Sequence, residues 1–266
     1  MLETARVNAN AEPMKGAHLL WLEAPGIASQ AKPGQFVMVR CGENDERPLR
    51  RPFSIHQREG DKIALLFNIV GDGTQWLAQR TSGDKIDLLG PLGNGFTIHQ
   101  DSKKLLLVAG GIGIAPLRFL ADEAVKLGLS TTLLYGTASA TQLYPHLPKV
   151  NLAATTTEDG SAGEKGMITD LMPNLLPNLL PDLLTDSTKT TEQIFACGPL
   201  PMYKTMAKMP ELKTKPVQIS LEVRMGCGLG VCYGCTVKTR NGLKQVCQDG
   251  PIFELNDILW GALKDI

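Results

Sequence analysis

The stretch KLLLVAGGIGIAP, residues 104–116, divides the 266-residue chain into two sequence patterns. Its first part, Lys104–Ala109, is a continuous apolar run that predicts a buried strand. Apolar residues recur at helical spacing over Ala115–Leu127, and Pro116 suits the first turn of that helix. Gly110–Gly113 therefore predicts a tight turn that leads from a strand into a helix.

Downstream of this turn the chain alternates between strands and helical segments. Further strands are predicted at Thr131–Tyr135, Asn151–Thr157 and Gln193–Ala196. Strands that alternate with helices favour a parallel sheet with crossover helices. We expect residues 102–216 to form one parallel α/β domain.

Upstream of the turn, residues 1–101 predict an antiparallel β-barrel. Short apolar stretches recur between turn signals such as Pro33-Gly34 and Gly83-Asp84. These stretches are Ala17–Leu22, Gln35–Arg40, Lys62–Val70 and Lys85–Leu89. Closely spaced short strands of this kind are typical of a barrel.

Residues 217–266 predict a third, small domain that holds four of the six cysteines. Cys227, Cys232 and Cys235 follow the spacing C-x4-C-x2-C, and Cys247 comes after eleven further residues. This is the plant-type [2Fe–2S] arrangement, in which a glycine-rich loop wraps a small cluster. We expect Cys247 to close the site from a separate strand. Because about 50 residues make a small core, we also expect the metal to support the fold.

Zinc and disulfides are the alternatives for these cysteines. Zinc sites usually have two paired C-x2-C arms, whereas here three ligands share one loop and the fourth stands alone. Three disulfides are disfavoured because we expect a reducing compartment. Cys41 lies outside the cluster and is expected to be a bystander.

Bulk composition excludes several classes of partner. The net charge is zero and the pI about 6.9, so no basic field exists to recruit nucleic acid or anionic lipid. No apolar run approaches the ~18–20 residues that a membrane span needs. The polar N-terminus lacks the apolar core of a secretion signal. We expect a cytoplasmic protein with neither a nucleic-acid nor a membrane partner.

Two segments of the barrel region predict a phosphate site. Arg51-Pro52-Phe53-Ser54 ends a strand-like segment and can deliver a guanidinium and a hydroxyl to one phosphate. Asn68-Ile69-Val70 reads as a strand, and Gly71–Thr74 is a glycine-rich turn whose backbone amides can cradle a pyrophosphate. Gly90–Phe96 is a second glycine-rich loop that is expected to close the barrel.

The α/β region predicts a dinucleotide site at one edge of the sheet. Gly110, Gly111, Gly113 and Pro116 can place phosphates near a helix N-terminus, although the Rossmann G-x-G-x-x-G motif is absent. Cys197-Gly198-Pro199 follows the last strand and reaches the same edge. The alternatives are an unliganded turn and simple core packing for Cys197.

Met172–Leu184 contains a local repeat of Pro-Asn-Leu-Leu or Pro-Asp-Leu-Leu. It is interpreted as a helix or surface segment that leads into a polar linker, and no chemistry is assigned to it.

With these motifs in this order, about residues 5–210 resemble the ferredoxin–NADP reductase superfamily. Its members pair a flavin-binding β-barrel with a nicotinamide-binding α/β domain. Three further segments, Thr157–Asp170, Ser220–Cys235 and Val246–Phe253, are similar to the electron-transfer subunits of class 1B dihydroorotate dehydrogenases. That second resemblance runs nearly from end to end.

The resemblance implies three cofactors, and a role for one thiol. It implies FAD at Arg51, Pro52, Phe53, Ser54, Asn68, Ile69, Val70, Gly73 and Thr74, and a [2Fe–2S] cluster on the four cysteines. NAD is the expected electron acceptor, with Cys197 helping to orient the nicotinamide. Gly136–Ala140 offers no Arg or Lys for the 2′-phosphate of NADP, and no acidic residue either.

The resemblance also implies a partner and a pathway. The partner is an FMN-containing catalytic subunit that oxidises dihydroorotate to orotate in pyrimidine (UMP) biosynthesis, in a heterotetramer with two of each subunit. This chain would be the NAD-linked oxidoreductase subunit and would not oxidise dihydroorotate alone. Electrons would pass from FMN through the cluster to FAD, and from FAD as hydride to NAD⁺.

Three alternatives remain at this point. Small subunits of NADH-dependent ferredoxin–NADP oxidoreductases and of sulfide dehydrogenases are similar, but they typically carry Asp at the position of Cys227. A stand-alone flavin and iron–sulfur reductase would use the same cofactors with a soluble acceptor. A zinc-stabilised binding module would be colourless.

Overall fold

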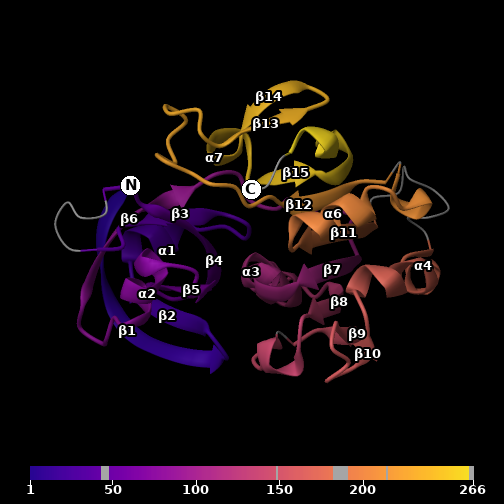
Figure 1. Ribbon diagram of the computed structural model, residues 1–266, viewed down its shortest axis with the longest axis horizontal. Coiled ribbons are helices and arrows are strands. Elements are labelled where there is room, and N and C mark those ends of the chain that lie inside the picture. The colour runs from indigo at the N-terminus through magenta and orange to yellow at the C-terminus, as the bar shows by residue number, and fades with distance from the viewer. Residues whose placement is uncertain (43–47, 148, 182–190, 214, 264–266) are drawn as a thin grey trace.

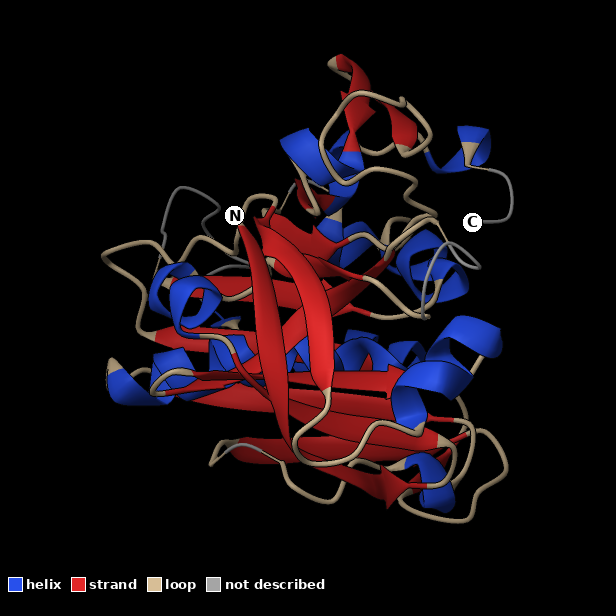
Figure 2. Ribbon diagram, turned by 90° about the vertical axis from the view of Figure 1, so that its left-hand side faces the viewer, coloured by secondary structure: helices blue, strands red, loops and turns tan. Residues whose placement is uncertain are grey.

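A computed structural model describes residues 1–42, 48–147, 149–181, 191–213 and 215–263 (Figure 1). The barrel lies on one side of the molecule, the larger sheet on the other, and the cysteine region above the junction between them. The view from the barrel side shows the strands of the cysteine region projecting above the rest (Figure 2).

The first region is a closed six-stranded antiparallel barrel in the order β1-β2-β5-β4-β3-β6. Its strands are β1 (Leu2–Met14), β2 (Ala17–Glu23), β3 (Phe36–Val39), β4 (Arg51–Glu59), β5 (Lys62–Asn68) and β6 (Lys85–Leu92), with the short helices α1 (Pro25–Gln30) and α2 (Asp72–Ala78) between strands. The four predicted strands are confirmed. The sequence missed β1, because it buries little more than Ala5, Val7 and Met14 and otherwise reads as polar.

Two local predictions for the barrel were wrong. Arg51–Ser54 begins β4 instead of ending a strand, so Ser54 lies inside the strand and Arg51 at its entrance. Asn68 is the last residue of β5, and Ile69 and Val70 lie beyond it. The glycine-rich turn that follows is shorter than expected, because α2 begins at Asp72.

The second region is built on a seven-stranded sheet in the order β10-β9-β8-β7-β11-β12-β15. It comprises β7 (Lys104–Gly110), α3 (Ile114–Lys126), β8 (Ser130–Thr137), β9 (Asn151–Thr157), β10 (Glu164–Lys165), α4 (Ile168–Leu179), β11 (Glu192–Cys197) and α6 (Leu200–Met206). Short 3-10 helices occur at Gly111–Gly113, Ala140–Gln142, Pro210–Leu212, Leu255–Asp257 and Trp260–Ala262. The central strands are parallel, as predicted.

The leucine repeat is helical in its described part. Helix α4 contains Pro173 and Pro177, which are exposed, whereas Met172 and Leu176 are buried in the core. A four-residue repeat nearly matches the helical period of 3.6 residues, so the prolines share the solvent side and the leucines turn inward. The end of the repeat, residues 182–184, and most of the polar segment behind it lie outside the described residues.

The cysteine region is joined to the large sheet. Strand β12 (Val217–Ser220) pairs in parallel with β11, and β15 (Ile252–Glu254) pairs antiparallel with β12. A hairpin of β13 (Thr236–Thr239) and β14 (Gly242–Gln245) leads into the short helix α7 (Val246–Asp249). One apolar core contains Met38 of the barrel, Val217 of the sheet and Val237 of the hairpin. The last 50 residues thus share their core with the rest of the protein.

Candidate functional site

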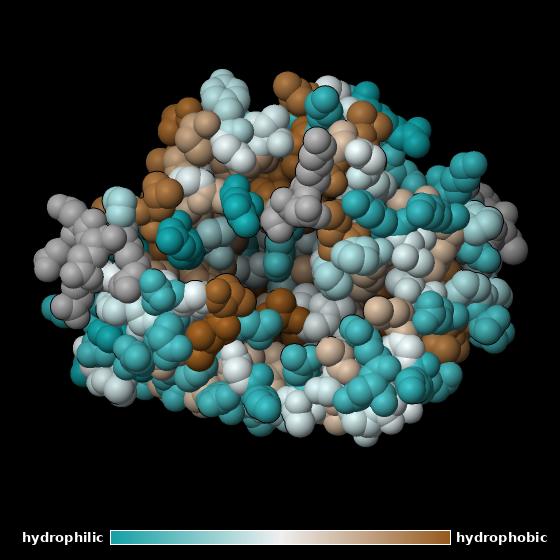
Figure 3. Space-filling model, in the orientation of Figure 1, coloured by the Kyte–Doolittle hydropathy of each residue, from teal (hydrophilic) through white to brown (hydrophobic). Residues whose placement is uncertain are grey.

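A cavity of about 1050 Å³ lies where the barrel, helix α3 and the segment before the cysteine loop meet. Its volume is at the upper limit of the ~300–1,000 Å³ typical of small-molecule sites. It is lined by Phe36, Leu49, Arg51, Pro52, Phe53, Ser54, Leu66, Phe67, Asn68, Val70, Gly71, Asp72, Gly73, Thr74, Ile112, Ala115, Ser220, Leu221, Glu222, Val223, Arg224, Met225 and Pro251. Figure 3 shows the surface hollowed at this junction. The structure therefore gathers nearly all of the predicted phosphate-site residues into one cavity, whereas Ile69 is not among its lining residues.

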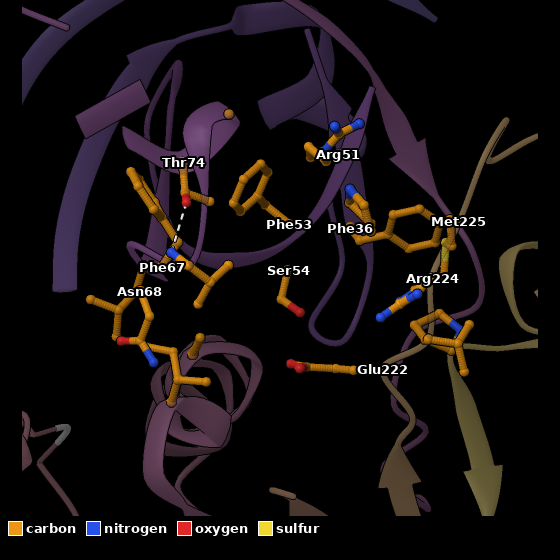
Figure 4. Close-up of a pocket in the computed structure, with 18 of the residues that line it drawn as sticks. Phe36, Arg51, Phe53, Ser54, Phe67, Asn68, Thr74, Glu222, Arg224 and Met225 are labelled. Atoms are coloured by element: carbon orange, nitrogen blue, oxygen red, sulfur yellow. Dashed lines mark hydrogen bonds between the residues drawn. The ribbon is translucent and has the colours of Figure 1, made fainter. Parts of the chain in front are cut away.

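The entrance of β4 and the turn before α2 form one end of the cavity (Figure 4). The guanidinium of Arg51 donates a 2.7 Å hydrogen bond to the carbonyl of Leu49, which holds it at the rim. A side chain at Gly73 would place its Cβ 3.3 Å from Cys41 and 3.7 Å from the Arg51 Nε. Glycine thus keeps the turn close to the guanidinium, as an approaching phosphate requires.

Thr74 shapes this turn with its own hydroxyl. Its Oγ1 accepts hydrogen bonds from the amides of Val70 (2.9 Å) and Gly71 (3.1 Å) and donates one to the Gly71 carbonyl (2.9 Å). The hydroxyl is therefore occupied by the turn. Val70, which is 83% exposed, forms the apolar rim beside it.

Ser54 and Glu222 lie on opposite sides of the middle of the cavity (Figure 4). Ser54 comes from the barrel strand β4, and Glu222 follows β12 of the large sheet. Glu222 is exposed in the open cavity, and the surrounding protein partly desolvates its carboxyl. Burial raises the pKa of Glu222 above its ordinary value. Sequence reasoning missed this residue, because Ser220–Met225 is remote from the barrel motifs in the chain.

The glycines after β7 lie against the loop after β11. A Cβ at Gly110 would lie 2.8 Å from Pro199, and one at Gly113 would lie 2.1 Å from the Cys197 carbonyl. Glycine is therefore required for the two loops to touch. Pro116 lies in the first turn of α3, as predicted, and the carboxyl ends of β7 and β11 form a common edge beside the cavity.

Cys197 is fully buried behind that edge. Its thiol packs in the apolar core and lies 3.7 Å from the Ser220 carbonyl, which also accepts a 2.6 Å hydrogen bond from Tyr203. Burial, followed by the nearby Glu222, raises the pKa of Cys197. The thiol therefore stays protonated and does not line the cavity.

An acidic residue reaches the edge of the sheet from a neighbouring strand. Thr137 of β8 pairs with Thr157 of β9, and Asp159 follows two residues later. The Asp159 amide donates to the Ala138 carbonyl (3.2 Å), and its carboxylate accepts two bonds from Ser161. Gly136–Ala140 after β8 offered no acidic residue, because the carboxylate comes from the segment that follows β9.

The cysteine loop brings the four thiols together in two pairs. The Sγ atoms of Cys235 and Cys247 lie 3.3 Å apart and are buried. Cys227 and Cys232 interact through their side chains at the more exposed side. Cys247 lies in helix α7, so the expectation of a strand was wrong. Among the described residues, no three His, Cys, Asp or Glu side chains converge as a single metal ion requires.

Backbone amides favour thiolates in this loop. Although partial burial acts to raise it, hydrogen bonds from the amides of Leu229, Cys232 and Val231 lower the pKa of Cys227 to about 6. Burial raises the pKa of Cys247 to about 12. Exposed and buried thiols therefore meet in one site, and amides are directed at both sides: three at Cys227 and that of Gly230 at Cys247.

The loop packs directly on the barrel. Gly228 has a φ of +71°, and a Cβ there would lie 2.6 Å from Met38 of β3 and 3.1 Å from Leu92 of β6. Phe36, on the same strand as Met38, lines the cavity. The cysteine site and the cavity are thus separated by one strand and by the segment Glu222–Met225.

Apolar side chains are exposed around the cysteines. Leu229 is 50% exposed, Val231 72% and Tyr233 70%. Tyr233 has a φ of 58° and is the single described non-glycine residue with a positive φ. Its carbonyl accepts hydrogen bonds from the amide and hydroxyl of Thr236, which hold the strained backbone.

In the described part of the chain, no helix combines the length and apolarity that a membrane crossing needs.

Comparisons with known proteins agree with this arrangement. Residues 222–259 match the family model of the iron–sulfur cluster binding domain of dihydroorotate dehydrogenase B. The chain is 38% identical over 247 residues to the electron transfer subunit of dihydroorotate dehydrogenase B (NAD(+)) of Desulforamulus reducens, with 90% of each chain covered. It is 37% identical to the subunit of the same name from Clostridium acetobutylicum, with 84% and 85% covered.

Solved structures share the fold. An NADH-dependent reduced ferredoxin–NADP oxidoreductase superposes with a TM-score of 0.81 at 28% identity, over 97% of this chain and 90% of that chain. A ferredoxin–NADP⁺ reductase from Neisseria gonorrhoeae, with bound FAD and NADP, superposes with a TM-score of 0.59 at 18% identity, over 77% and 88%. The second likeness concerns the fold alone.

Proposed function

The chain belongs to the family of electron transfer subunits of dihydroorotate dehydrogenase B (NAD(+)), and on this premise we propose its path of electrons and its sites. Electrons pass from the FMN of a catalytic subunit through a [2Fe–2S] cluster and FAD to NAD⁺, in pyrimidine biosynthesis. The observation that carries this proposal is the shared wall between the cavity and the cysteine loop. The cytoplasmic location expected from the sequence stays a prediction.

The cavity is the proposed FAD site. Arg51 and Gly73 suit the pyrophosphate, with Pro52, Phe53, Ser54, Asn68, Val70 and Thr74 along the remaining wall. Ile69 supports the site from behind, since its amide donates to the Gly16 carbonyl. A flavin exchanges electrons singly or as hydride, which suits a junction between a cluster and a nicotinamide. Ser54 and Glu222 are the polar groups at its centre.

The four cysteines are the proposed cluster ligands. A [2Fe–2S] cluster takes four thiolates, two for each iron. On this proposal Cys227 and Cys232 bind one iron and Cys235 and Cys247 bind the other, which the observed contacts between these thiols support. Amides that donate to Cys227 stabilise negative charge on this ligand. Hydrogen bonds to a ligand sulfur favour the reduced cluster, so they raise its reduction potential.

The sheet edge beside the cavity is the proposed nicotinamide site. Gly110, Gly111, Gly113 and Pro116 form its first loop, and Gly198 and Pro199 form the second. Because its thiol is buried, Cys197 would not contact the nicotinamide. It would instead support the loop that carries Gly198 by packing beneath it. The proposed domains are residues 1–101 for FAD binding, 102–216 for NAD binding and 217–266 for the cluster. Strands β12 and β15 of the third segment complete the seven-stranded sheet of the second.

The partner is proposed to dock on the cysteine loop. Leu229, Val231 and Tyr233 form an exposed apolar surface directly around the ligands, and electron transfer requires the partner's FMN to approach them. Such a surface is typical of a protein–protein interface. The proposed assembly is a heterotetramer with two of each subunit, in which this chain alone does not oxidise dihydroorotate.

Co-expression with a dihydroorotate dehydrogenase catalytic subunit tests the proposal. After purification on a tag carried by this chain, dihydroorotate-dependent reduction of NAD⁺ is measured. The complex is expected to form NADH, and Cys227→Ser is expected to abolish this activity. Cys41→Ser, which changes a buried thiol outside the loop, is the matched control and should keep it.

Other results would contradict the proposal in distinct ways. A flavin and iron–sulfur protein that ignores both partner and dihydroorotate would indicate a ferredoxin-linked or sulfide-linked oxidoreductase. A protein that reduces a soluble acceptor without any partner would indicate a stand-alone reductase. A colourless zinc protein would exclude electron transfer.

A further inference from the structure

His56 connects the barrel to the α/β region at a buried point. It lies on β4 two residues after Ser54, where the pairing of β4 with β5 shifts its register between Ile55 and Gln57. Its imidazole is fully buried and contacts two groups of the other region. Nδ1 lies 2.9 Å from the carbonyl oxygen of Ala115, and Nε2 lies 3.0 Å from the hydroxyl of Tyr144.

These partners define the tautomer of the ring. A carbonyl oxygen can only accept, so Nδ1 must carry the proton and donate it to Ala115. Nε2 is then the acceptor, and the Tyr144 hydroxyl donates to it. Burial lowers the pKa of His56 to about 3, so the ring stays neutral at physiological pH. The neutral tautomer therefore makes both bonds, one as donor and one as acceptor.

Tyr144 is itself held in place. Its ring packs edge-on against His56 at a centroid distance of 5.1 Å, and its amide donates to the Tyr135 hydroxyl at 3.3 Å. Tyr135 belongs to β8, in the middle of the large sheet. The imidazole is thus fixed between a helix and a residue anchored on the sheet.

The groups joined by His56 belong to the two proposed cofactor sites. Ser54 lines the proposed flavin cavity, and Ala115 lines the same cavity from the first turn of α3. That turn directly follows Gly110–Gly113, the loop proposed for the nicotinamide dinucleotide. One side chain therefore links the strand under the flavin to the loop under the nicotinamide.

Phe119 of α3 packs into the barrel core beneath the Arg58 guanidinium, and the polar side-chain contacts between β4 and α3 lie nearer the surface. Gln57 donates a 3.3 Å hydrogen bond to Asp122, and Arg58 lies 3.9 Å from Glu123, where both side chains are partly exposed. Exposed pairs of this kind contribute little and allow several geometries. Among the described polar contacts between β4 and α3, the bond from His56 to Ala115 is the fully buried one.

We propose that His56 is a positioning residue that sets the approach of FAD to the nicotinamide. The inference rests on the proposed function. Hydride transfer requires the reacting atoms to lie about 3–3.5 Å apart, and a displacement of 1 Å can cost about 100-fold in rate. Because two regions of the chain hold the two cofactors, their contact determines this distance. The hydrogen bond from His56 to Ala115 fixes the position of the first turn of α3 relative to β4.

Two substitutions of His56 separate its bonds. In His56→Asn, the amide nitrogen replaces Nδ1 and can still donate to Ala115. In His56→Gln, the longer side chain reaches the position of Nε2 and keeps only a contact with Tyr144. Tyr144→Phe removes only the hydroxyl that bonds to His56 Nε2. This variant tests the same linkage if a His56 variant fails to fold. Gln57→Ala, which changes the partly exposed contact, is the matched control.

The first measurement is the rate at which NADH reduces FAD in the loaded protein, by rapid mixing. His56→Gln is expected to slow this rate at least about tenfold, with less than about threefold change in the NADH dissociation constant. Tyr144→Phe should slow it less, and His56→Asn and Gln57→Ala should stay within about threefold of wild type. Flavin content and dihydroorotate-dependent dye reduction in the complex should not change.

A second measurement uses the protein without cofactors. Amide hydrogen exchange in α3, at the residues that follow Pro116, is expected to accelerate in His56→Gln and to stay near wild type in His56→Asn. Unchanged exchange together with an unchanged NADH rate in His56→Gln would overturn the inference. An equal loss of flavin, NADH rate and dye reduction in both His56 variants would show a general packing role and also overturn it. A wild-type protein that NADH does not reduce would overturn the proposed function itself.

Discussion

The Sγ atoms of Cys235 and Cys247 lie 3.3 Å apart although twelve positions separate the residues, because hairpin β13–β14 folds back between them. Replacing Cys247 by serine is expected to prevent cluster assembly, since a serine hydroxyl is a far weaker ligand than a thiolate. Flavin binding should persist, because Cys247 does not line the cavity. Iron content, flavin content and the visible spectrum of the purified protein test this. Loss of both cofactors would contradict the separation of the two sites.

Glu222 is expected to make stability depend on pH. Its pKa is raised by burial, so the folded protein binds this proton more tightly than the unfolded chain. Stability should therefore fall as the pH rises from the ordinary glutamate pKa of about 4.3 to the higher folded value, and stay lower above it. Glu222→Gln removes this effect. In the protein without cofactors, the variant should melt slightly higher than wild type at pH 7 and equally at pH 4, because solvent in the cavity screens much of the effect at the exposed Glu222. A difference that does not depend on pH would contradict the assignment.

Asp159 is expected to exclude NADP. A carboxylate at the carboxyl end of these strands can accept a hydrogen bond from the ribose 2′-hydroxyl of NAD and repels a 2′-phosphate. Hydrogen bonds from Ser161 lower the pKa of Asp159, which keeps it charged. Asp159→Ser should raise the kcat/KM ratio of NADP to NAD at least about tenfold. Glu164→Gln, on the adjacent β10, is the control. An unchanged ratio would place the ribose elsewhere.

Gly228 is expected to be indispensable for docking the cysteine loop on the barrel. Gly228→Ala adds a Cβ 2.6 Å from Met38 in a backbone conformation with φ of +71°. The expected loss of stability is about 1–3 kcal/mol, from overpacking and backbone strain. Gly242→Ala has a similar φ of +96° but meets nothing within 4 Å, so it isolates the strain. Denaturant unfolding of both variants measures the difference, and equal effects would show that the Met38 contact is unimportant.

Tyr233 is expected to strengthen partner binding at a cost in stability. Its φ of 58° is unfavourable for a large side chain, so Tyr233→Gly should stabilise the isolated chain. The same change removes an aromatic ring that is 70% exposed, and it should weaken the complex at least about tenfold. Thermal melting of the chain and titration with the catalytic subunit give the two values. An unchanged affinity would move the interface away from this loop.

The local motifs were predictable because each of them is defined by neighbours in the chain. The C-x4-C-x2-C loop needs only glycines between its ligands, and the strand before Gly110–Gly113 needs only a continuous apolar run. Strand β1 was missed because most of its residues are exposed or half-buried, so its local sequence shows little apolar pattern. The boundary errors at Arg51 and Asn68 arose because strand ends depend on pairing with β3 and β2, which the local sequence does not specify.

The sequence by itself determined the cofactor chemistry, since ligand spacing and glycine-rich turns act over a few residues. Only the tertiary structure decided which distant residues share a site. Glu222 faces Ser54 because β12 joins the sheet beside β11, and Asp159 reaches its edge because β9 lies next to β8. His56 meets Ala115 and Tyr144 because the barrel packs on α3. Such contacts between distant residues follow from the packing of whole helices and strands. The energy of that packing is spread over many contacts, so no short sequence motif indicates it.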